Sequence, residues 1–167
     1  KSGERGIFNR QASKTQAAKN GRRKTDYEFG TNPCSEILLR PNQFCNLTEV
    51  VIRETDNIDT LLDKVELATI LGTLQSTLTK FPYLRKIWQF NTEDERLLGV
   101  SLTGIMDNPL TNSKNKALDK TLEHLRNVAI RTNKEWAKKL GIQQSTAITC
   151  VKPSGTVSQL VDSASGI

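Results

Sequence analysis

A cysteine stands between an asparagine and a glutamate in the segment Asn32-Pro33-Cys34-Ser35-Glu36. On an extended backbone alternate side chains point to the same side, so the polar groups of residues 32, 34 and 36 would converge. A cysteine sulfur can be a thiolate or, after one-electron oxidation, a radical. A carboxylate can take up a proton, and an amide can bind a hydroxyl as donor and as acceptor. The segment is a candidate active site, and the simpler alternative is a buried cysteine beside a turn with a surface glutamate.

A second cysteine, Cys45, follows Cys34 by eleven residues. A loop of that length can fold back and bring the two sulfurs close enough to share reducing equivalents. The alternative is a core cysteine on a strand, because Phe44 and Leu47 flank it and free cysteines are often buried. The third cysteine, Cys150, is interpreted as a small buried strand residue without a role.

The third candidate is the loop Lys152-Pro153-Ser154-Gly155-Thr156, which follows an apolar stretch and precedes a short helix predicted at residues 157–161. Gly155 permits a close backbone approach. The hydroxyls of Ser154, Thr156 and Ser158, with the free amides at a helix start, could bind an anion. The spacing is not that of a Walker A loop, and an ordinary strand-to-helix turn is the alternative.

The elements that must position these residues alternate between strands and helices. Strands are predicted at residues 44–52, 97–105 and 146–151, an extended run at 37–39, and a turn leading into a short strand at 2–10. Long helices are predicted at 58–79, where Asp59 or Thr60 could cap the start and Phe81-Pro82 the end, and at 115–140, while residues 11–24 could be a short helix or a loop. Their predicted apolar faces consist of Leu61, Val65, Ala68, Leu71, Leu74 and Leu78, and of Leu118, Leu122, Leu125, Ala129, Trp136 and Leu140. This alternation favours an α/β fold with mostly parallel strands.

Composition narrows the classes of function. Lys and Arg number 24 against 18 Asp and Glu, a net charge of +6 that suits a nucleic acid or a nucleotide polyphosphate, or simply a solvated surface. Three cysteines do not make a disulfide framework, and one histidine without a CxxC pair predicts no metal site. Without a long apolar run or a signal peptide, a cytoplasmic protein that does not contact a membrane is expected.

The segment from Asn32 to Glu36 resembles the finger loop of the ribonucleotide reductases. Four further segments resemble that family in the same order, at residues 3–10, 44–50, 99–104 and 152–167. The resemblance implies that residues 1–167 are one partial catalytic domain, truncated at both ends and inactive alone. The implied fold is part of a ten-stranded α/β barrel whose finger loop carries the active-site cysteine.

The resemblance also implies roles for individual residues. Cys34 would become a thiyl radical that removes the 3′ hydrogen of the ribose, and Glu36 would take the 3′-hydroxyl proton. Asn32 would hold the ribose hydroxyls, and Cys45 would be one of two thiols that reduce the 2′ position. A radical must be shielded from water, so Cys34 is expected on a buried loop tip. The implied phosphate-binding residues are Pro153, Ser154, Gly155, Thr156 and Ser158.

The spacing of Cys34 and Cys45 is similar to that of the class II reductases, which use adenosylcobalamin. The sequence of residues 44–50 is similar to that of the monomeric class II reductases, which reduce ribonucleoside triphosphates. The family's first redox cysteine, its C-terminal cysteine pair and its cobalamin-binding segment are not in this chain. The implied partners are a ribonucleotide, a thioredoxin-type reductant and the rest of the reductase chain, without direct nucleic-acid contact.

Two other functions remain open from the residues alone. One is a small basic nucleic-acid-binding module that uses Arg22-Arg23-Lys24. The other is a non-catalytic dithiol or disulfide domain that uses Cys34 and Cys45.

Overall fold

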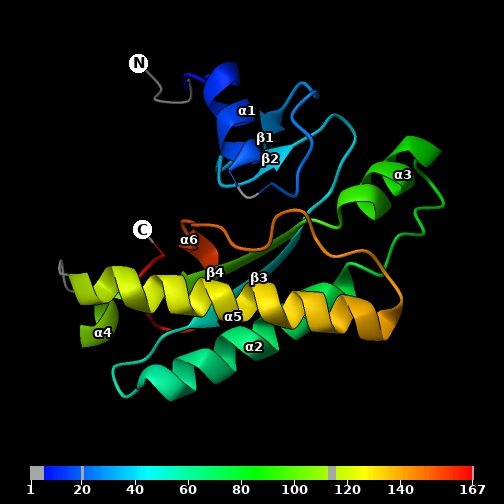
Figure 1. Ribbon diagram of the computed structural model, residues 1–167. Coiled ribbons are helices and arrows are strands. Elements are labelled where there is room, and N and C mark those ends of the chain that lie inside the picture. The colour runs from blue at the N-terminus through cyan, green and yellow to red at the C-terminus, as the bar shows by residue number, and fades with distance from the viewer. Residues whose placement is uncertain (1–5, 20, 113–115, 167) are drawn as a thin grey trace.

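The computed structural model describes residues 6–19, 21–112 and 116–166. Parts of the segments that carry the resemblance, residues 3–5 and 167, lie outside the described residues. The strands are β1 Gly30–Thr31, β2 Leu38–Leu39, β3 Asn46–Val51 and β4 Leu98–Thr103. The helices are α1 Arg10–Ala18, α2 Ile58–Gln75, α3 Lys86–Glu95, α4 Pro109–Asn112, α5 Lys116–Leu140 and α6 Gly155–Leu160, with a 3-10 turn, η1, at Ile105–Asp107 (Figure 1).

The centre of the molecule is a small parallel sheet. Strand β3 pairs with β4 along its whole length, from Asn46 opposite Leu98 to Val51 opposite Thr103. On the other edge of β4, residues 147–150 add a short parallel segment, in which the Val100 amide donates to the Ile148 carbonyl at 2.8 Å. The strands predicted at 44–52 and 97–105 are confirmed. The one predicted at 146–151 is reduced to a bridge, because only one of its edges is paired within the described chain.

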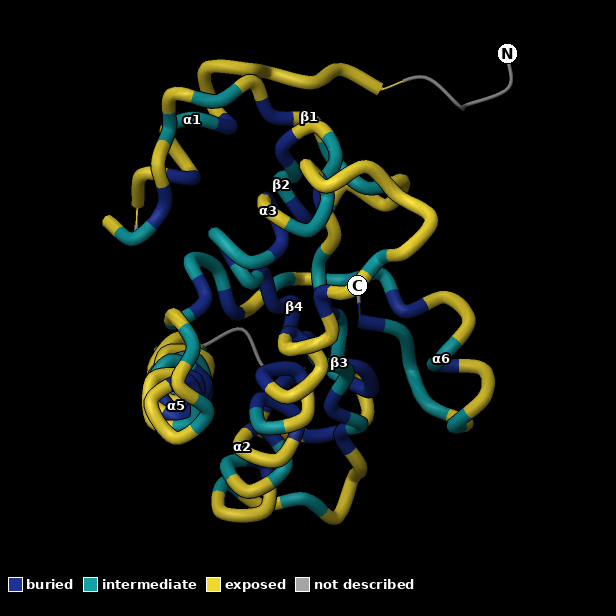
Figure 2. The backbone as a smooth tube through the Cα atoms, turned by 90° about the vertical axis from the view of Figure 1, so that its right-hand side faces the viewer, coloured by how far each residue is buried: buried dark blue, intermediate teal, exposed yellow. Residues whose placement is uncertain are grey.

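Helices α2 and α5 cover the same face of this sheet and lie side by side (Figure 1). Even-numbered strand residues point toward them, and Figure 2 shows the buried residues gathered between the helices and the strands. The core contains Val50, Ile52, Leu61, Val65, Ala68, Leu98, Val100, Leu125, Val128, Ala129 and Ile148. Parallel strands in chain order with their connecting helices on one face are typical of a barrel wall, whereas a doubly wound sheet carries helices on both faces. The predicted α/β class is confirmed.

The N-terminal part of the chain lies on the other side of the sheet from α2 and α5 in both views (Figures 1 and 2). It consists of α1, whose first turn is capped by the Asn9 side chain, and of the antiparallel hairpin β1–β2. The short strand predicted around Ile7 and Phe8 is wrong, since both side chains are exposed and neither residue pairs with a neighbour in the described chain. Helix α1 instead occupies the first half of the segment predicted as helix or loop.

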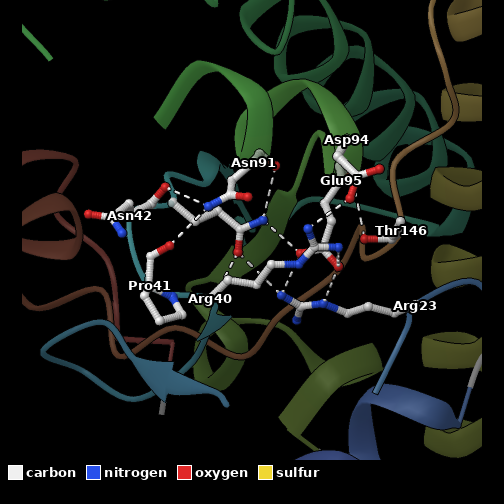
Figure 3. A network of polar contacts seen from close by, with 9 residues as sticks. Arg23, Arg40, Pro41, Asn42, Asn91, Asp94, Glu95 and Thr146 are labelled. Carbon is white, nitrogen blue, oxygen red and sulfur yellow. Dashed lines mark hydrogen bonds and ion pairs between the residues drawn. The ribbon is translucent and has the colours of Figure 1, made fainter. Parts of the chain in front are cut away.

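A buried network of charges fixes the hairpin to the rest of the molecule (Figure 3). Arg23 donates through Nε and Nη2 to the two carboxylate oxygens of Glu95, each at 2.8 Å. Arg40 contacts Glu95 at 3.1 Å and Asp94 at 2.7 Å, and Gln43 donates to Glu95 at 2.6 Å. Arg23 precedes β1 and Arg40 follows β2, so the network ties both ends of the hairpin to the last turn of α3.

Helix α2 differs from its prediction at both ends. Its N-cap is Asn57, which forms a capping box with Thr60, so the cap lies earlier than the predicted Asp59 or Thr60. The helix ends at Gln75, and the turn that follows directs Leu78 into solvent. Leu71 and Leu74 are also exposed, while Thr69, Gly72 and Thr73 take the buried face. Small residues are needed there because a Cβ at position 72 would already touch Leu98 at 3.5 Å.

The second long helix, α5, is confirmed and ends at the predicted glycine. Gly141 has φ +67°, and the Ile142 amide donates to the Ala137 carbonyl at 3.0 Å, as in a Schellman motif. Leu125 and Ala129 of the predicted apolar face are buried, but Leu122 is exposed. Among the described residues, none of the helices combines the length and apolar character that a membrane-spanning segment needs.

Candidate active site

The loop between β1 and β2 carries the first group of predicted site residues. Asn32 organises it: its side-chain oxygen accepts from the Ile37 amide at 3.0 Å, and its carbonyl accepts from the Ser35 amide at 3.0 Å. Ser35 has φ +65°. The backbone therefore turns at residues 32–35, and the expectation of an extended segment with three alternating side chains on one side is wrong. The hairpin, rather than an alternation, positions these residues.

Cys34 lies at the tip of this loop and is exposed, so the predicted burial of its sulfur is wrong for the described chain. The reason is geometric. The tip projects beyond the short hairpin, and the described sheet comprises only β3, β4 and the segment at 147–150, which cannot surround a loop.

Glu36 is the buried member of the loop, with a side chain only 1% exposed. Its Oε1 accepts a hydrogen bond from Lys152 Nζ at 2.9 Å, while its Oε2 is buried without a hydrogen-bond partner. Burial alone would raise the pKa of Glu36. The Lys152 ammonium, the Glu36 backbone and the Asn32 amide outweigh it, and together they hold the pKa of this carboxyl below its usual range. Glu36 is thus an anion at neutral pH with one free oxygen.

Lys152 is a residue that the sequence analysis left without a role. Its hydrogen bond with Glu36 raises the pKa of the Lys152 ammonium, partly opposed by burial and supported by the nearby Cys34 and Glu49. The contact joins the β1–β2 loop to the start of the 152–158 loop, 116 residues further along the chain. The available sequence signal was a lysine immediately before the predicted anion-binding loop.

Cys45 and Cys150 are half-buried free thiols near the same carboxylate. Burial raises the pKa of Cys45, and the Glu36 charge raises it further. Burial likewise raises the pKa of Cys150 to about 12, with Glu36, Cys45 and Glu49 acting in the same direction. Both sulfurs therefore keep their protons at neutral pH.

The face of the sheet that turns away from α2 and α5 forms the floor of this site. A Cβ added at Gly99, on β4, would overlap Leu47 and come within 3.1 Å of both Cys150 Sγ and Ile37. The glycine lets the β1–β2 hairpin and Cys150 pack directly on the strand. Glu49 on β3 has a buried Oε1 without a hydrogen-bond partner, and sequence reasoning missed it because it resembled an ordinary strand residue.

The predicted phosphate-binding loop is arranged differently from what its hydroxyls suggested. Ser154 is buried with φ +60°, and its hydroxyl donates to Thr103 Oγ1 at 2.9 Å. Ser158 is also buried, whereas Gly155 and Thr156 are exposed. Helix α6 begins at Gly155, earlier than predicted. The half-buried Pro153 is held from behind, since its carbonyl accepts from the Gly166 amide at 3.1 Å. Ser154 and Ser158 thus shape the loop, and phosphate binding remains a prediction.

A cavity of about 550 Å³ opens beside the β1–β2 loop. Ser35, Glu36 and Cys150 line its polar side, and Leu122 and Leu125 of α5 line its apolar side. It lies along residues 149–151, at the edge of the sheet that is unpaired in the described chain. Within the described ranges, no group of three or more His, Cys, Asp or Glu side chains is arranged to hold a metal ion.

The basic cluster at residues 22–24 does not form an open patch. Arg23 is buried in its ion pair with Glu95. Burial and the neighbouring Arg126 lower the pKa of Arg22, whose side chain is partly covered. Only Lys24 is fully exposed, which argues against the nucleic-acid-binding alternative.

Comparison with known proteins gives a consistent result. No protein-family model matches the chain. The adenosylcobalamin-dependent ribonucleoside-triphosphate reductase of Lactobacillus leichmannii is 28% identical over 99% of this chain, which covers 26% of that protein. The enzyme of the same name from Lactobacillus acidophilus is 30% identical over 83% of this chain, which covers 22% of that protein.

The fold agrees with the sequence. A crystal structure of a B12-dependent, class II ribonucleotide reductase superimposes with a TM-score of 0.65 and 26% identity, covering 81% of this chain and 22% of the solved one. The chain spans about a quarter of the length of the curated relatives it matches. The resemblance is therefore confirmed: in sequence and in fold, the chain is related to the adenosylcobalamin-dependent, class II ribonucleotide reductases.

Proposed function

We propose that residues 1–167 are part of the catalytic domain, a ten-stranded α/β barrel, of an enzyme that reduces ribonucleotides to deoxyribonucleotides for DNA synthesis. Ribonucleoside triphosphates are the proposed substrates, because the relatives are named for them. The observation that carries the proposal is the 2.9 Å contact between Glu36 and Lys152. It joins the finger loop to the predicted phosphate-binding loop, so a nucleotide could reach both at once.

The proposed reaction uses Cys34, Glu36 and Cys45 in turn. A thiyl radical on Cys34 takes the 3′ hydrogen atom of the ribose, and Glu36 accepts the 3′-hydroxyl proton. The 2′ oxygen then leaves as water, and Cys45 with a second thiol supplies two electrons and two protons and becomes a disulfide. Cys34 then returns the hydrogen atom to the 3′ carbon, and Glu36 returns the proton to the 3′ oxygen. The net change is one ribonucleotide and two thiols giving one deoxyribonucleotide, one disulfide and water.

Adenosylcobalamin is the proposed radical source, because the relatives are named as dependent on it. When bound, it supplies the radical chemistry that protein side chains lack. Among the described residues, the feature that fits such a large group is the exposure of Cys34 at the loop tip. Its binding residues are expected elsewhere in the longer protein, together with the second redox thiol.

The longer protein should also cover what this chain leaves open. The unpaired sheet edge at residues 147–150, the cavity beside it and the exposed Cys34 lie around the same loop. Further strands added at this edge would continue the wall and enclose the loop tip, giving the radical the shielding from water that it needs. A thioredoxin-type reductant in the cytoplasm would then restore the dithiol after each turnover.

The test is the Cys34→Ser variant of the full-length reductase. A serine hydroxyl cannot carry the radical, so deoxyribonucleotide formation should be lost while nucleotide binding, measured by equilibrium dialysis, is retained. Cys150→Ser is the matched control, since it changes another cysteine that has no role in the reaction, and it should preserve turnover. Appreciable reduction by Cys34→Ser would refute the radical role.

Cys45→Ser separates the two stages of the chemistry. Exchange of the 3′ hydrogen should persist, because Cys34 and Glu36 are intact. Turnover with thioredoxin should stop, because the electrons for the 2′ position have no source. Normal steady-state turnover in this variant would show that another residue supplies the thiol.

A further inference from the structure

The Glu36 carboxylate is held by a single cation in an otherwise enclosed position. Lys152 Nζ lies 2.9 Å from Oε1, and Oε2 is buried without a hydrogen-bond partner. The Lys152 side chain is itself only 22% exposed. A carboxylate this buried would favour its protonated form unless a charge compensated it.

The other charged and titratable groups around this pair do not provide that compensation. Glu36 is coupled electrostatically to Cys45 and Cys150, and Lys152 to Cys34 and Glu49. Each of these groups is neutral when protonated and negative when ionised, so none of them supplies a positive charge. Lys152 is thus the one cation among the described groups that act on Glu36.

We infer that Lys152 is a positioning residue for Glu36, holding Oε1 in an ion pair between the two loops and leaving Oε2 as the free proton acceptor. The inference rests on the proposed function for its catalytic meaning, but the ion pair can be tested without turnover. In the reaction, the substrate O–H bond would break and the proton would bind Oε2, while Lys152 continues to hold Oε1. The lysine itself exchanges no proton.

A different role is available to a lysine at this position and must be distinguished. Lys152 directly precedes Pro153 and begins the loop that contains the exposed Gly155. The substrate phosphates are proposed to bind at this loop. If its main contact were a phosphate, its removal would weaken nucleotide binding and leave the ionisation of Glu36 unchanged. If it positions Glu36, its removal changes the protonation of that carboxylate even without nucleotide.

The experiment is a carboxyl ¹³C NMR titration of the chain, with the Glu36 resonance assigned by its loss in Glu36→Gln. In Lys152→Met the pKa of Glu36 should rise, because burial then acts without the compensating charge. Lys152→Arg should restore the low pKa, since it keeps the cation. Lys64→Met is the matched control: it removes a lysine that pairs with Asp56 at 2.5 Å, and it should move the pKa of Asp56 but not of Glu36. An unchanged Glu36 titration in a folded Lys152→Met chain overturns the inference.

The full-length reductase gives a second readout that does not depend on the isolated chain. In Lys152→Met the acid limb of the kcat/KM profile should move to higher pH, with nucleotide affinity retained. A loss of nucleotide affinity with an unmoved pH profile would assign Lys152 to phosphate binding and overturn the inference. If instead Cys34→Ser remained active while the NMR result held, the proposed radical chemistry would fail and the Lys152–Glu36 coupling would stand.

Discussion

The protonation states in the site suit hydrogen-atom and proton transfer. Burial raises the pKa of Cys45 and brings that of Cys150 to about 12, so both carry S–H bonds at neutral pH. Exchange with a disulfide requires a thiolate, and a raised pKa makes that form scarce. Glu36, in contrast, is held as an anion that can accept a proton. These states fit the proton-acceptor role proposed for Glu36.

Asp56 allows the electrostatics of single residues to be tested through stability. Burial would raise the pKa of Asp56, but Lys64, the Arg53 amide and Thr60 together lower it below its ordinary value of 3.8. When the pKa of a carboxyl is lower in the folded than in the unfolded protein, the ionised carboxylate stabilises the fold at pH values above the unfolded-state pKa. This stabilisation is lost as the pH falls through the folded-state pKa. Asp56→Asn should reduce the free energy of unfolding at pH 7 by about 1–3 kcal/mol.

The measurement is urea unfolding of both proteins between pH 7 and acid. The difference between wild type and Asp56→Asn should be constant at neutral pH and should shrink below about pH 3.8, where the unfolded carboxyl becomes protonated. A difference that stays the same at every pH would show that the carboxylate charge is not responsible.

Single residues of the site could be predicted from sequence only where a local motif carried them. Roles for Cys34, Glu36 and Cys45 could be assigned from their segments. Lys152 also begins such a segment, but its role depends on a partner 116 residues away. The inward hydroxyl of Ser154 depends on its contact with Thr103, which no local pattern reveals. Long-range pairing, not residue type, decided these cases.

At the scale of elements, the β1–β2 hairpin packs on strand β4 at Gly99, which has no side chain. Gly99→Ala would push its Cβ into Leu47 and within 3.1 Å of Cys150 and Ile37, so it should destabilise the fold by about 1–3 kcal/mol through overpacking. Gly72→Ala is the control, because its Cβ meets ordinary contacts at 3.5 Å and alanine favours a helix. Thermal unfolding should show a lower Tm for the first variant and an equal or higher Tm for the second.

The contact between α2 and α5 contains a buried polar link. Asn133 donates to Thr73 Oγ1 at 3.0 Å and to Ser145 Oγ at 3.1 Å, and it accepts from the Ser145 amide at 3.0 Å. Asn133→Ala would leave these buried groups unsatisfied and should lower the free energy of unfolding by about 1–3 kcal/mol. Asn127→Ala, at an exposed position of the same helix, should change it by less than about 0.5 kcal/mol. Equal effects in urea unfolding would contradict the role of the buried link.

Elements with strong periodicity were predictable, and their details were not. The spacing of apolar residues predicted α2 and α5, because each helix buries several apolar side chains in the core. In the second half of α2, close packing on Leu98 favours a small residue at Gly72, and the buried Thr73 contacts Asn133 of α5. The leucine pattern therefore indicated the wrong face there. Pairing of residues 147–150 is limited by what lies beside them, which local sequence does not determine.

At the scale of the whole molecule, both faces of the sheet are covered, whereas one sheet edge and one loop tip are not. The helices α2 and α5 cover one face of the sheet, and the N-terminal hairpin packs on the other. Both the edge at residues 147–150 and the tip at Cys34 lack cover in the described chain. In the barrel proposed above, further strands would cover both positions. The chain spans about a quarter of the length of the relatives it matches.

Glu95 ties both ends of the β1–β2 hairpin to α3, so its replacement tests how the hairpin is held to the rest of the molecule. Glu95→Gln would leave the buried guanidinium groups of Arg23 and Arg40 without their shared carboxylate. Breaking a buried ion pair from one side is expected to lower the free energy of unfolding by about 3–5 kcal/mol. Glu123→Gln, which removes a partner of Arg126 from an exposed pair, should lower it by no more than about 1 kcal/mol.

The part of the chain that loosens in Glu95→Gln distinguishes a role in holding the hairpin from a general loss of stability. Because Arg23 and Arg40 flank the hairpin while α2 and α5 share a separate apolar core, the hairpin should loosen first. Hydrogen exchange in Glu95→Gln should therefore accelerate at residues 21–45 well before it does in α2 and α5. The Glu36–Lys152 contact should be lost along with the hairpin, since Glu36 lies on its loop. Uniform acceleration across both helices and the hairpin would instead show that the network stabilises one undivided core.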